Sequence, residues 1–112
     1  MKKIEAIIRK SKFDEVKSAL HNIEVNFFSY WDVTGVGNET QGHVYRGITY
    51  STSDIQRRYL VIVVSDDFAD KTIAVLREHA KTDKVGDGKI FISTIDEVIR
   101  IRTGETGQKA IN

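Results

Sequence analysis

Two arginines separated by a single residue are the feature of this sequence best suited to bind an anion. In the segment VIRIR at 98–102, isoleucine alternates with arginine. On a β-strand this alternation buries Ile99 and Ile101 and exposes Arg100 and Arg102, about 6.5–7 Å apart, on the opposite face. Two guanidinium groups at that spacing suit successive phosphates of a polyphosphate. A solvated sheet face with two ordinary arginines explains the pair equally well.

Two glycine-rich segments could contribute to the same site. The sequence GDGK at 86–89 precedes a predicted strand, and GVG at 35–37 follows one. Glycines let backbone N–H groups approach an anion closely, and the lysine adds a positive charge. Each segment alone is more simply read as a turn, because neither a GxxxxGK[ST] nor a complete GxGxxG motif is present. Combined with the arginine pair, GDGK predicts the second half of a phosphate site.

The sequence offers little for catalysis. It has no cysteine, which excludes a thiol nucleophile and a cysteine-ligated zinc. His21, His43 and His79 lack the spacing of metal ligands. The acidic pair Asp66-Asp67 follows Ser65 at the expected start of a helix, where carboxylates stabilise the positive end of the helix dipole. We therefore predict a protein that is not an enzyme.

Length and charge define the class of protein. The chain has 112 residues and a formal net charge of +1, which predicts one domain, 1–112, and excludes a strongly basic nucleic-acid binder. No apolar run approaches the roughly 20 residues of a membrane span. Met1–Lys3 leads directly into strand-like sequence without the apolar region of a secretory signal. We expect a soluble, cytoplasmic domain.

The aromatic run at 27–31 has two interpretations. Phe27, Phe28, Tyr30 and Trp31 could form a base-stacking platform, but the surrounding charges are mainly acidic and would repel a phosphate backbone. We therefore assign these aromatics to the core or to a subunit interface and predict no nucleic-acid partner.

The periodicity of apolar residues predicts alternating strands and helices. Strands are expected at 3–9, 25–33, 57–64, 89–93 and within 95–102, with helices from Ser11, capped with Asp14, and from Ser65. This order predicts an α+β, ferredoxin-like βαββαβ sandwich. The aperiodic stretch 38–55 is longer than an ordinary connection, which favours a functional loop. Two helices cover one sheet face only, so the apolar residues of the other face favour oligomerisation.

Four segments resemble the PII signal-transduction proteins in the expected order: MKKIEAII at 1–8, GHVYRGITY at 42–50, VGDGKIF at 85–91 and IRIRTGE at 99–105. The resemblance covers essentially the whole chain. It implies a homotrimer that binds ATP or ADP in clefts between subunits, with an effector loop at about 38–55 and a C-terminal tail at 103–112. Implied partners are an ammonium transporter or other nitrogen-metabolism proteins, so the membrane is reached only through a transporter.

The resemblance also implies roles for individual residues. The phosphates would lie against the GDGK turn of one subunit and the arginine pair of the next. The adenine would lie near Ile7, Ser29, Val63 and Val85. Residues 35–37 would form the hinge of the effector loop. The implied nucleotide-binding set is Ile7, Ser29, Gly35, Val36, Gly37, Val63, Val85, Gly86, Asp87, Gly88, Lys89, Arg100 and Arg102. Tyr50 matches a tyrosine that some members carry in uridylylated form.

The sequence departs from the family pattern at the base of the loop. It reads GVGNETQGH at 35–43, where members usually have GFGRQKGH. The glutamine that would help to hold Mg²⁺ and 2-oxoglutarate is therefore either displaced to Gln41 or replaced by Glu39 or Thr40. Arg57 stands where the family usually has a lysine. Gln56 also replaces a frequent proline, which predicts a less tethered loop over 38–55.

Two alternatives remain open on the sequence alone. One is a ferredoxin-like regulatory module that senses a different small molecule in its inter-subunit cleft. The other is a slow nucleotide hydrolase, for which no positioned base is evident.

Overall fold

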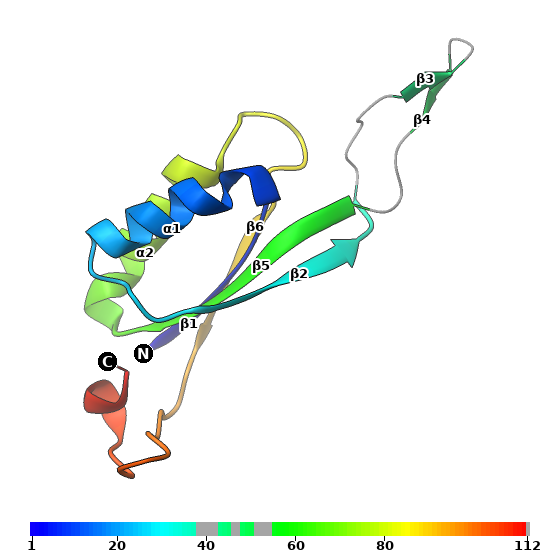
Figure 1. Ribbon diagram of the computed structural model, residues 1–112. Helices are drawn as coiled ribbons and strands as arrows, with labels where there is room; N and C mark the ends of the chain where they lie inside the picture. Colours follow the sequence, from blue (N-terminus) through cyan, green and yellow to red (C-terminus); the bar gives the residue numbers. More distant parts are fainter. Residues whose placement is uncertain (38–42, 46–47, 51–54, 112) are drawn as a thin grey trace.

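The computed structural model of the chain describes residues 1–37, 43–45, 48–50 and 55–111. Side chains are described outside the short segments 43–45 and 48–50. Along the chain (Figure 1) the elements are β1 (Lys2–Ile8), a 3₁₀ turn (Lys10–Lys12), α1 (Phe13–Asn22), β2 (Ser29–Gly35), β3 (His43–Tyr45), β4 (Ile48–Tyr50), β5 (Ile55–Val64), α2 (Asp66–Ala80), β6 (Lys89–Thr94) and a 3₁₀ turn (Gly107–Ala110).

The main sheet is antiparallel, with strand order β2-β5-β1-β6. β1 lies between two strands that come much later in the chain, with Ile4 opposite Ile62 of β5 on one side and Ile92 of β6 on the other. β2 completes the far edge by pairing with β5 from Ser29 to Gly35. This arrangement confirms the predicted α+β, ferredoxin-like βαββαβ fold.

The core lies between the sheet and the two helices, which pack side by side on one sheet face (Figure 1). Every second residue is buried there from Ile4 onward in β1 and from Leu60 onward in β5, as period-two alternation requires. The helices supply stripes at steps of three and four. The largest fully buried apolar side chains are Ile4, Val16, Leu20, Leu60, Ile62 and Leu76.

The opposite sheet face carries aromatic residues without a covering helix. Trp31 of β2 is 46% exposed and stacks on Tyr59 of β5, with ring centroids 4.8 Å apart and planes 19° apart. The Tyr59 hydroxyl donates a hydrogen bond to the Glu5 carboxylate on β1. Phe91 of β6 is also exposed. We call this surface, with Glu5, Trp31, Tyr59 and Phe91, the open face. Its exposed aromatic side chains agree with the expected uncovered apolar face of the sheet.

Two predicted boundaries were wrong near α1. The capping box of Ser11 and Asp14 does not form: residues 10–12 make a 3₁₀ turn, and α1 begins at Phe13 without a side-chain cap. The aromatic strand begins at Ser29 instead of at 25, because Glu24 adopts a left-handed conformation (φ 66°) that directs the chain out of α1. Phe27 consequently lies off the sheet and is 73% exposed, so it does not belong to the core of this chain.

The predicted strand within 95–102 was also wrong. Beyond β6 the backbone forms one isolated bridge, Ile99 with Thr106, and closes a tight turn in which the N–H of Gly104 donates to the carbonyl of Arg100. Ile99 is 60% exposed and Ile101 is fully exposed. An alternating pattern needs a neighbouring strand to become sheet, and this segment has none beside it in the described part of the chain.

The aperiodic stretch 38–55 contains more regular structure than the sequence indicated. β3 pairs with β4 in a two-stranded hairpin that projects from the end of the main sheet (Figure 1). β5 begins at Ile55, two residues earlier than expected. The predicted looseness of the loop at 38–55 falls largely outside the described residues. Within the described ranges, no helix is long and apolar enough to cross a bilayer.

Candidate functional site

A cleft of about 620 Å³ opens at the end of the sheet from which the β3–β4 hairpin projects. It lies where β2 ends, β5 begins and the chain turns from α2 into β6. Most of the residues predicted for nucleotide binding, together with Arg57, line it. The described lining residues are Ile7, Val33, Gly35, Val36, Gly37, Ile55, Arg57, Val85, Gly86, Gly88, Lys89 and Phe91.

The charge of the cleft is positive. Arg57 and Lys89 are its charged residues, and no carboxylate side chain lines it among the described residues. The remaining wall is apolar or glycine. Such a mixture of apolar lining and two cations suits a ligand that carries both a ring and anionic groups.

The turn before β6 passes so close to β1 that one position must be glycine. Gly88 has φ +106°, and a Cβ there would lie 1.6 Å from the carbonyl oxygen of Ile7. Gly86 also has a positive φ, +99°. Both glycines therefore have a structural reason that the sequence analysis did not give, since each adopts a backbone conformation that other residues rarely enter.

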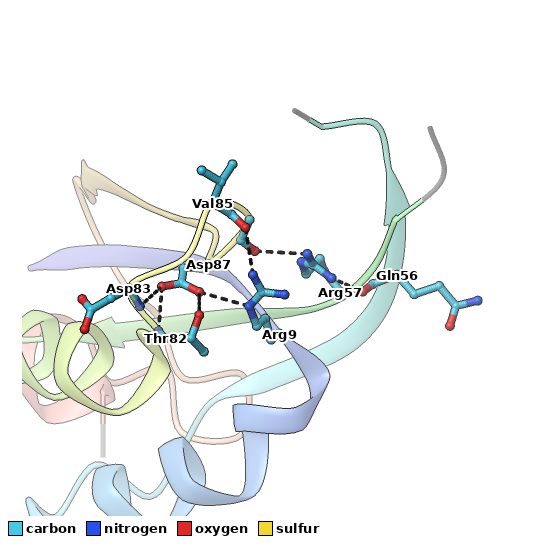
Figure 2. A network of polar contacts seen from close by, with 8 residues as sticks. Arg9, Gln56, Arg57, Thr82, Asp83, Val85 and Asp87 are labelled. Atoms are coloured by element: carbon cyan, nitrogen blue, oxygen red, sulfur yellow. Dashed lines mark hydrogen bonds and ion pairs between the residues drawn. The ribbon is translucent and has the colours of Figure 1, made fainter. Parts of the chain in front are cut away.

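Two arginines hold this turn by donating hydrogen bonds to two successive carbonyl groups (Figure 2). Arg57 donates from Nη2 to the carbonyl of Gly86 at 3.1 Å and from Nη1 to the carbonyl of Gln56 at 2.9 Å. Arg9, the residue that follows β1, donates from Nη2 to the carbonyl of Val85 at 2.9 Å. Arg57 thus joins the turn to the first residues of β5, at the base of the long loop. No sequence motif indicates the contribution of Arg9.

The Asp87 side chain does not line this cleft among the described residues, and its carboxylate is engaged by the preceding segment and by Arg9 instead. Its carboxylate accepts hydrogen bonds from the N–H of Thr82 (2.6 Å), the hydroxyl of Thr82, the N–H of Asp83 (3.0 Å) and Nε of Arg9 (3.0 Å) (Figure 2). Partial burial alone would raise the pKa of Asp87, but the donors of Thr82 and Arg9 outweigh it and hold that pKa far below its ordinary value.

Four of the predicted residues lie far from the cleft. Ser29 begins β2 and pairs with Val61, whereas Gly35 at the other end of β2 reaches the cleft. At about 3.3 Å per residue, six residues of strand separate the two by roughly 20 Å. Val63 lies toward the same remote end of β5. Arg100 and Arg102 belong to the C-terminal segment, at the opposite end of the sheet from the hairpin (Figure 1).

Arg100 does not stand beside Arg102 on a strand, so the spacing argument for this pair was wrong. Arg100 instead contacts its own segment: Nη1 lies 3.6 Å from Oε1 of Glu105, and Nη2 donates to the carbonyl of Lys109 at 3.0 Å. Within one chain the arginine pair and the GDGK turn do not form a joint site.

The structure gives no side-chain positions for four further predicted residues. Glu39, Thr40 and Gln41 lie outside the described residues, and of Tyr50 only the backbone, in β4, is described. Among the residues that the structure describes, no group of three or more His, Asp or Glu side chains could hold a metal ion.

Fold and site together define a ferredoxin-like domain with a positively charged cleft beside a projecting hairpin. A family model described as "Nitrogen regulatory protein P-II" matches residues 1–105. Proteins named nitrogen regulatory protein P-II from Cereibacter sphaeroides and Rhizobium meliloti are each 44% identical over 113 residues, covering 99% of this chain and all of theirs. The chain therefore belongs to the nitrogen regulatory P-II family.

A solved structure agrees with this assignment. The Arabidopsis thaliana PII protein, crystallised bound to citrate, superposes with a TM-score of 0.79 and 34% identity, over 98% of this chain and 88% of that one. The resemblance noted in the sequence is confirmed. Proteins of this family are nitrogen regulators that act in signal transduction and are not enzymes, which also confirms the prediction of a non-enzymatic chain.

Proposed function

We propose that this protein senses adenine nucleotides, ATP or ADP, in the cleft beside the GDGK turn. The observation that carries the proposal is the pairing of two cations, Arg57 and Lys89, with an apolar wall that includes Ile7 and Val85. The apolar wall suits a purine, which gains from burial of its faces. The cations and the exposed backbone of Gly86 and Gly88 suit the phosphates.

A second copy of the chain would complete the site. Arg100, Arg102, Ser29 and Val63 lie at the end of the molecule opposite the cleft, so they can meet a cleft only in another subunit. Contacts between two different ends of identical subunits are head-to-tail, and such contacts close into a ring when the rotation permits. A homotrimer packed through the open face would bring these ends together and cover Trp31 and Phe91.

The bound nucleotide would be read out through the long loop. Arg57 contacts both Gly86 of the turn and Gln56 at the loop base, so a ligand that engages Arg57 also alters the support of the loop. The readers would be nitrogen-metabolism proteins such as an ammonium transporter, met from the cytoplasmic side. Tyr50, at the end of the hairpin strand β4, is a candidate site of modification.

Mg²⁺ and 2-oxoglutarate are further candidate ligands. The described part of the cleft supplies no carboxylate, so a magnesium ion would depend on phosphate oxygens and on the segment Glu39–Gln41. The guanidinium group of Arg57 is suited to bind one carboxylate of a small dicarboxylic acid. The citrate bound by the Arabidopsis relative is also a small carboxylic acid.

Titration calorimetry with ATP and with ADP tests the proposal. The variant Lys89→Gln removes a cation of the cleft, and Lys17→Gln, at an exposed position of α1, is the matched control. We expect saturable binding that Lys89→Gln weakens and Lys17→Gln leaves unchanged. Absence of binding of both nucleotides at millimolar concentration would refute it. The same titration with citrate or 2-oxoglutarate alone tests the alternative, a module that senses a small carboxylic acid without a nucleotide.

A further inference from the structure

Arg9 and Asp87 form a largely enclosed ion pair beneath the turn that lines the cleft. Nε of Arg9 lies 3.0 Å from Oδ1 of Asp87, and the two side chains are 13% and 23% exposed. Neither side chain lines the cleft among its described residues. The pair is therefore next to the proposed ligand site without being part of its surface.

The contacts of this pair fix the direction of one peptide group in the turn. A trans peptide is planar, so its C=O and N–H point in opposite directions. Arg9 binds the carbonyl of Val85, which directs the N–H of Gly86 away from Arg9. Arg57 binds the next carbonyl, that of Gly86, and thereby directs the N–H of Asp87 away from Arg57. Two successive peptide groups are held by guanidinium donors.

The turn needs this support because its sequence leaves it free to rearrange. Gly86 and Gly88 both occupy positive φ, a region that glycine enters and leaves at little cost. Asp87, between them, is fastened through its carboxylate to Thr82, Asp83 and Arg9. Hydrogen bonds between charged groups are the stronger class, so the carboxylate ties both ends of the segment 82–87 to β1.

We propose that Arg9 and Asp87 are positioning residues for the anionic part of the cleft ligand: the pair holds the turn so that its peptide groups keep one orientation, and it touches no ligand itself. This inference rests on the proposed nucleotide site. It predicts that loss of the pair weakens recognition of phosphates while contacts to the adenine ring persist.

The test compares ligands that differ only in their phosphates. ATP, ADP and adenosine are titrated into the full chain. The proteins compared are the wild type and the variants Arg9→Gln, Arg9→Lys and Asp87→Asn. Lys17→Gln and Asp70→Asn, at exposed helical positions, are the charge-matched controls. We expect Arg9→Gln and Asp87→Asn to weaken ATP and ADP by about 10-fold or more. Adenosine should change by less than about two-fold, and Arg9→Lys should keep part of the ATP affinity because it retains the charge.

Equal weakening of adenosine and ATP, or unchanged ATP affinity in Arg9→Gln, would overturn the proposal. Thr82→Val, which removes one hydroxyl donor to Asp87 and little else, provides a milder variant should the others fold poorly, and it should lower ATP affinity more than adenosine affinity.

A measurement without nucleotide separates this inference from the proposed function. In the free protein, the amide NMR signals of Gly86 and Gly88 should shift in Arg9→Gln and Asp87→Asn and stay in place in Lys17→Gln. If the wild type binds no nucleotide, the proposed function fails, and these signals alone decide whether the pair orients the turn. Unmoved glycine signals would refute the role of the pair whatever the nucleotide result.

Discussion

The carboxylate of Asp87 accepts a hydrogen bond from the backbone N–H of Thr82 at 2.6 Å, across five residues of chain. With the additional donors of Asp83 and Arg9, this contact folds the segment between α2 and β6 into a closed loop. The cleft beside the GDGK turn therefore has a rigid polar support, whereas its other side continues into the β3–β4 hairpin.

Asp87→Asn should reduce stability in a manner that depends on pH. The pKa of Asp87 is lowered on folding, so its contribution is complete above the unfolded value near 3.9 and is lost as pH falls through the lower folded value. Urea unfolding should show a wild-type advantage over Asp87→Asn that is constant above about pH 5 and shrinks below about pH 4. A difference independent of pH would contradict the assignment of the charged carboxylate.

Gly88→Ala should destabilise the protein by more than the about 1–2 kcal/mol that a left-handed conformation costs by itself. The added Cβ would collide with the Ile7 carbonyl oxygen, a backbone atom of the central strand that cannot move aside. Gly104→Ala is the matched control, since Gly104 has φ +73° and a Cβ added there would meet no atom within 4 Å. Chemical denaturation of both variants gives the comparison, and equal losses would show that the close approach to β1 carries no cost.

Trp31→Glu should break the proposed assembly at micromolar concentration, because it places a charge on the open face where an aromatic side chain would be buried between subunits. Sedimentation velocity would then detect monomers, while Lys17→Glu on exposed α1 should sediment as the wild type does. Trp31 is the only tryptophan, so its fluorescence should also shift to the red on dilution of the wild type. A wild type that sediments as a monomer would contradict the trimer.

Glu105→Gln should strengthen nucleotide binding by up to about five-fold. The Glu105 carboxylate lies 3.6 Å from Nη1 of Arg100, and a phosphate that binds this arginine would compete with it. An exposed ion pair of this kind is worth about 0.2–1 kcal/mol, which sets the size of the gain. Calorimetry with ATP measures it, and Glu97→Gln, an exposed acidic residue of the same segment, is the control. Weaker binding by Glu105→Gln would mean that Glu105 supports Arg100 instead of competing for it.

The fold could be predicted well from the sequence where burial in this chain governs the pattern. The alternation of Ile4, Ala6 and Ile8 and the stripe of Val16 and Leu20 reflect contacts inside one core, so local periodicity was enough. The cleft was also predictable, because glycines at 35–37 and 86–88 mark its walls in the sequence.

The failures have a common physical cause. Ile99 and Ile101 alternate with arginines like a strand, yet their burial would need a surface beyond this chain, so the pattern could not place them. By periodicity alone, Arg9 is an outward-facing residue at the end of a strand, and the GDGK motif does not say which groups the Asp87 side chain contacts. Their pairing spans 78 residues, and periodicity carries no information at that range. The one local signal was an aspartate set among backbone N–H groups in a turn, where such side chains often accept hydrogen bonds.

The central place of β1 has a consequence for how the domain is made. β1 leaves the ribosome before the other strands of the domain, and it pairs on both edges. Its partners are β5, which begins at residue 55, and β6, which ends at residue 94. Until most of the domain has been synthesised, Lys2–Ile8 has an unpaired edge and an uncovered apolar side. The sheet can therefore be completed only after translation has passed β6, and until then the newly made β1 keeps an edge that needs protection from aggregation.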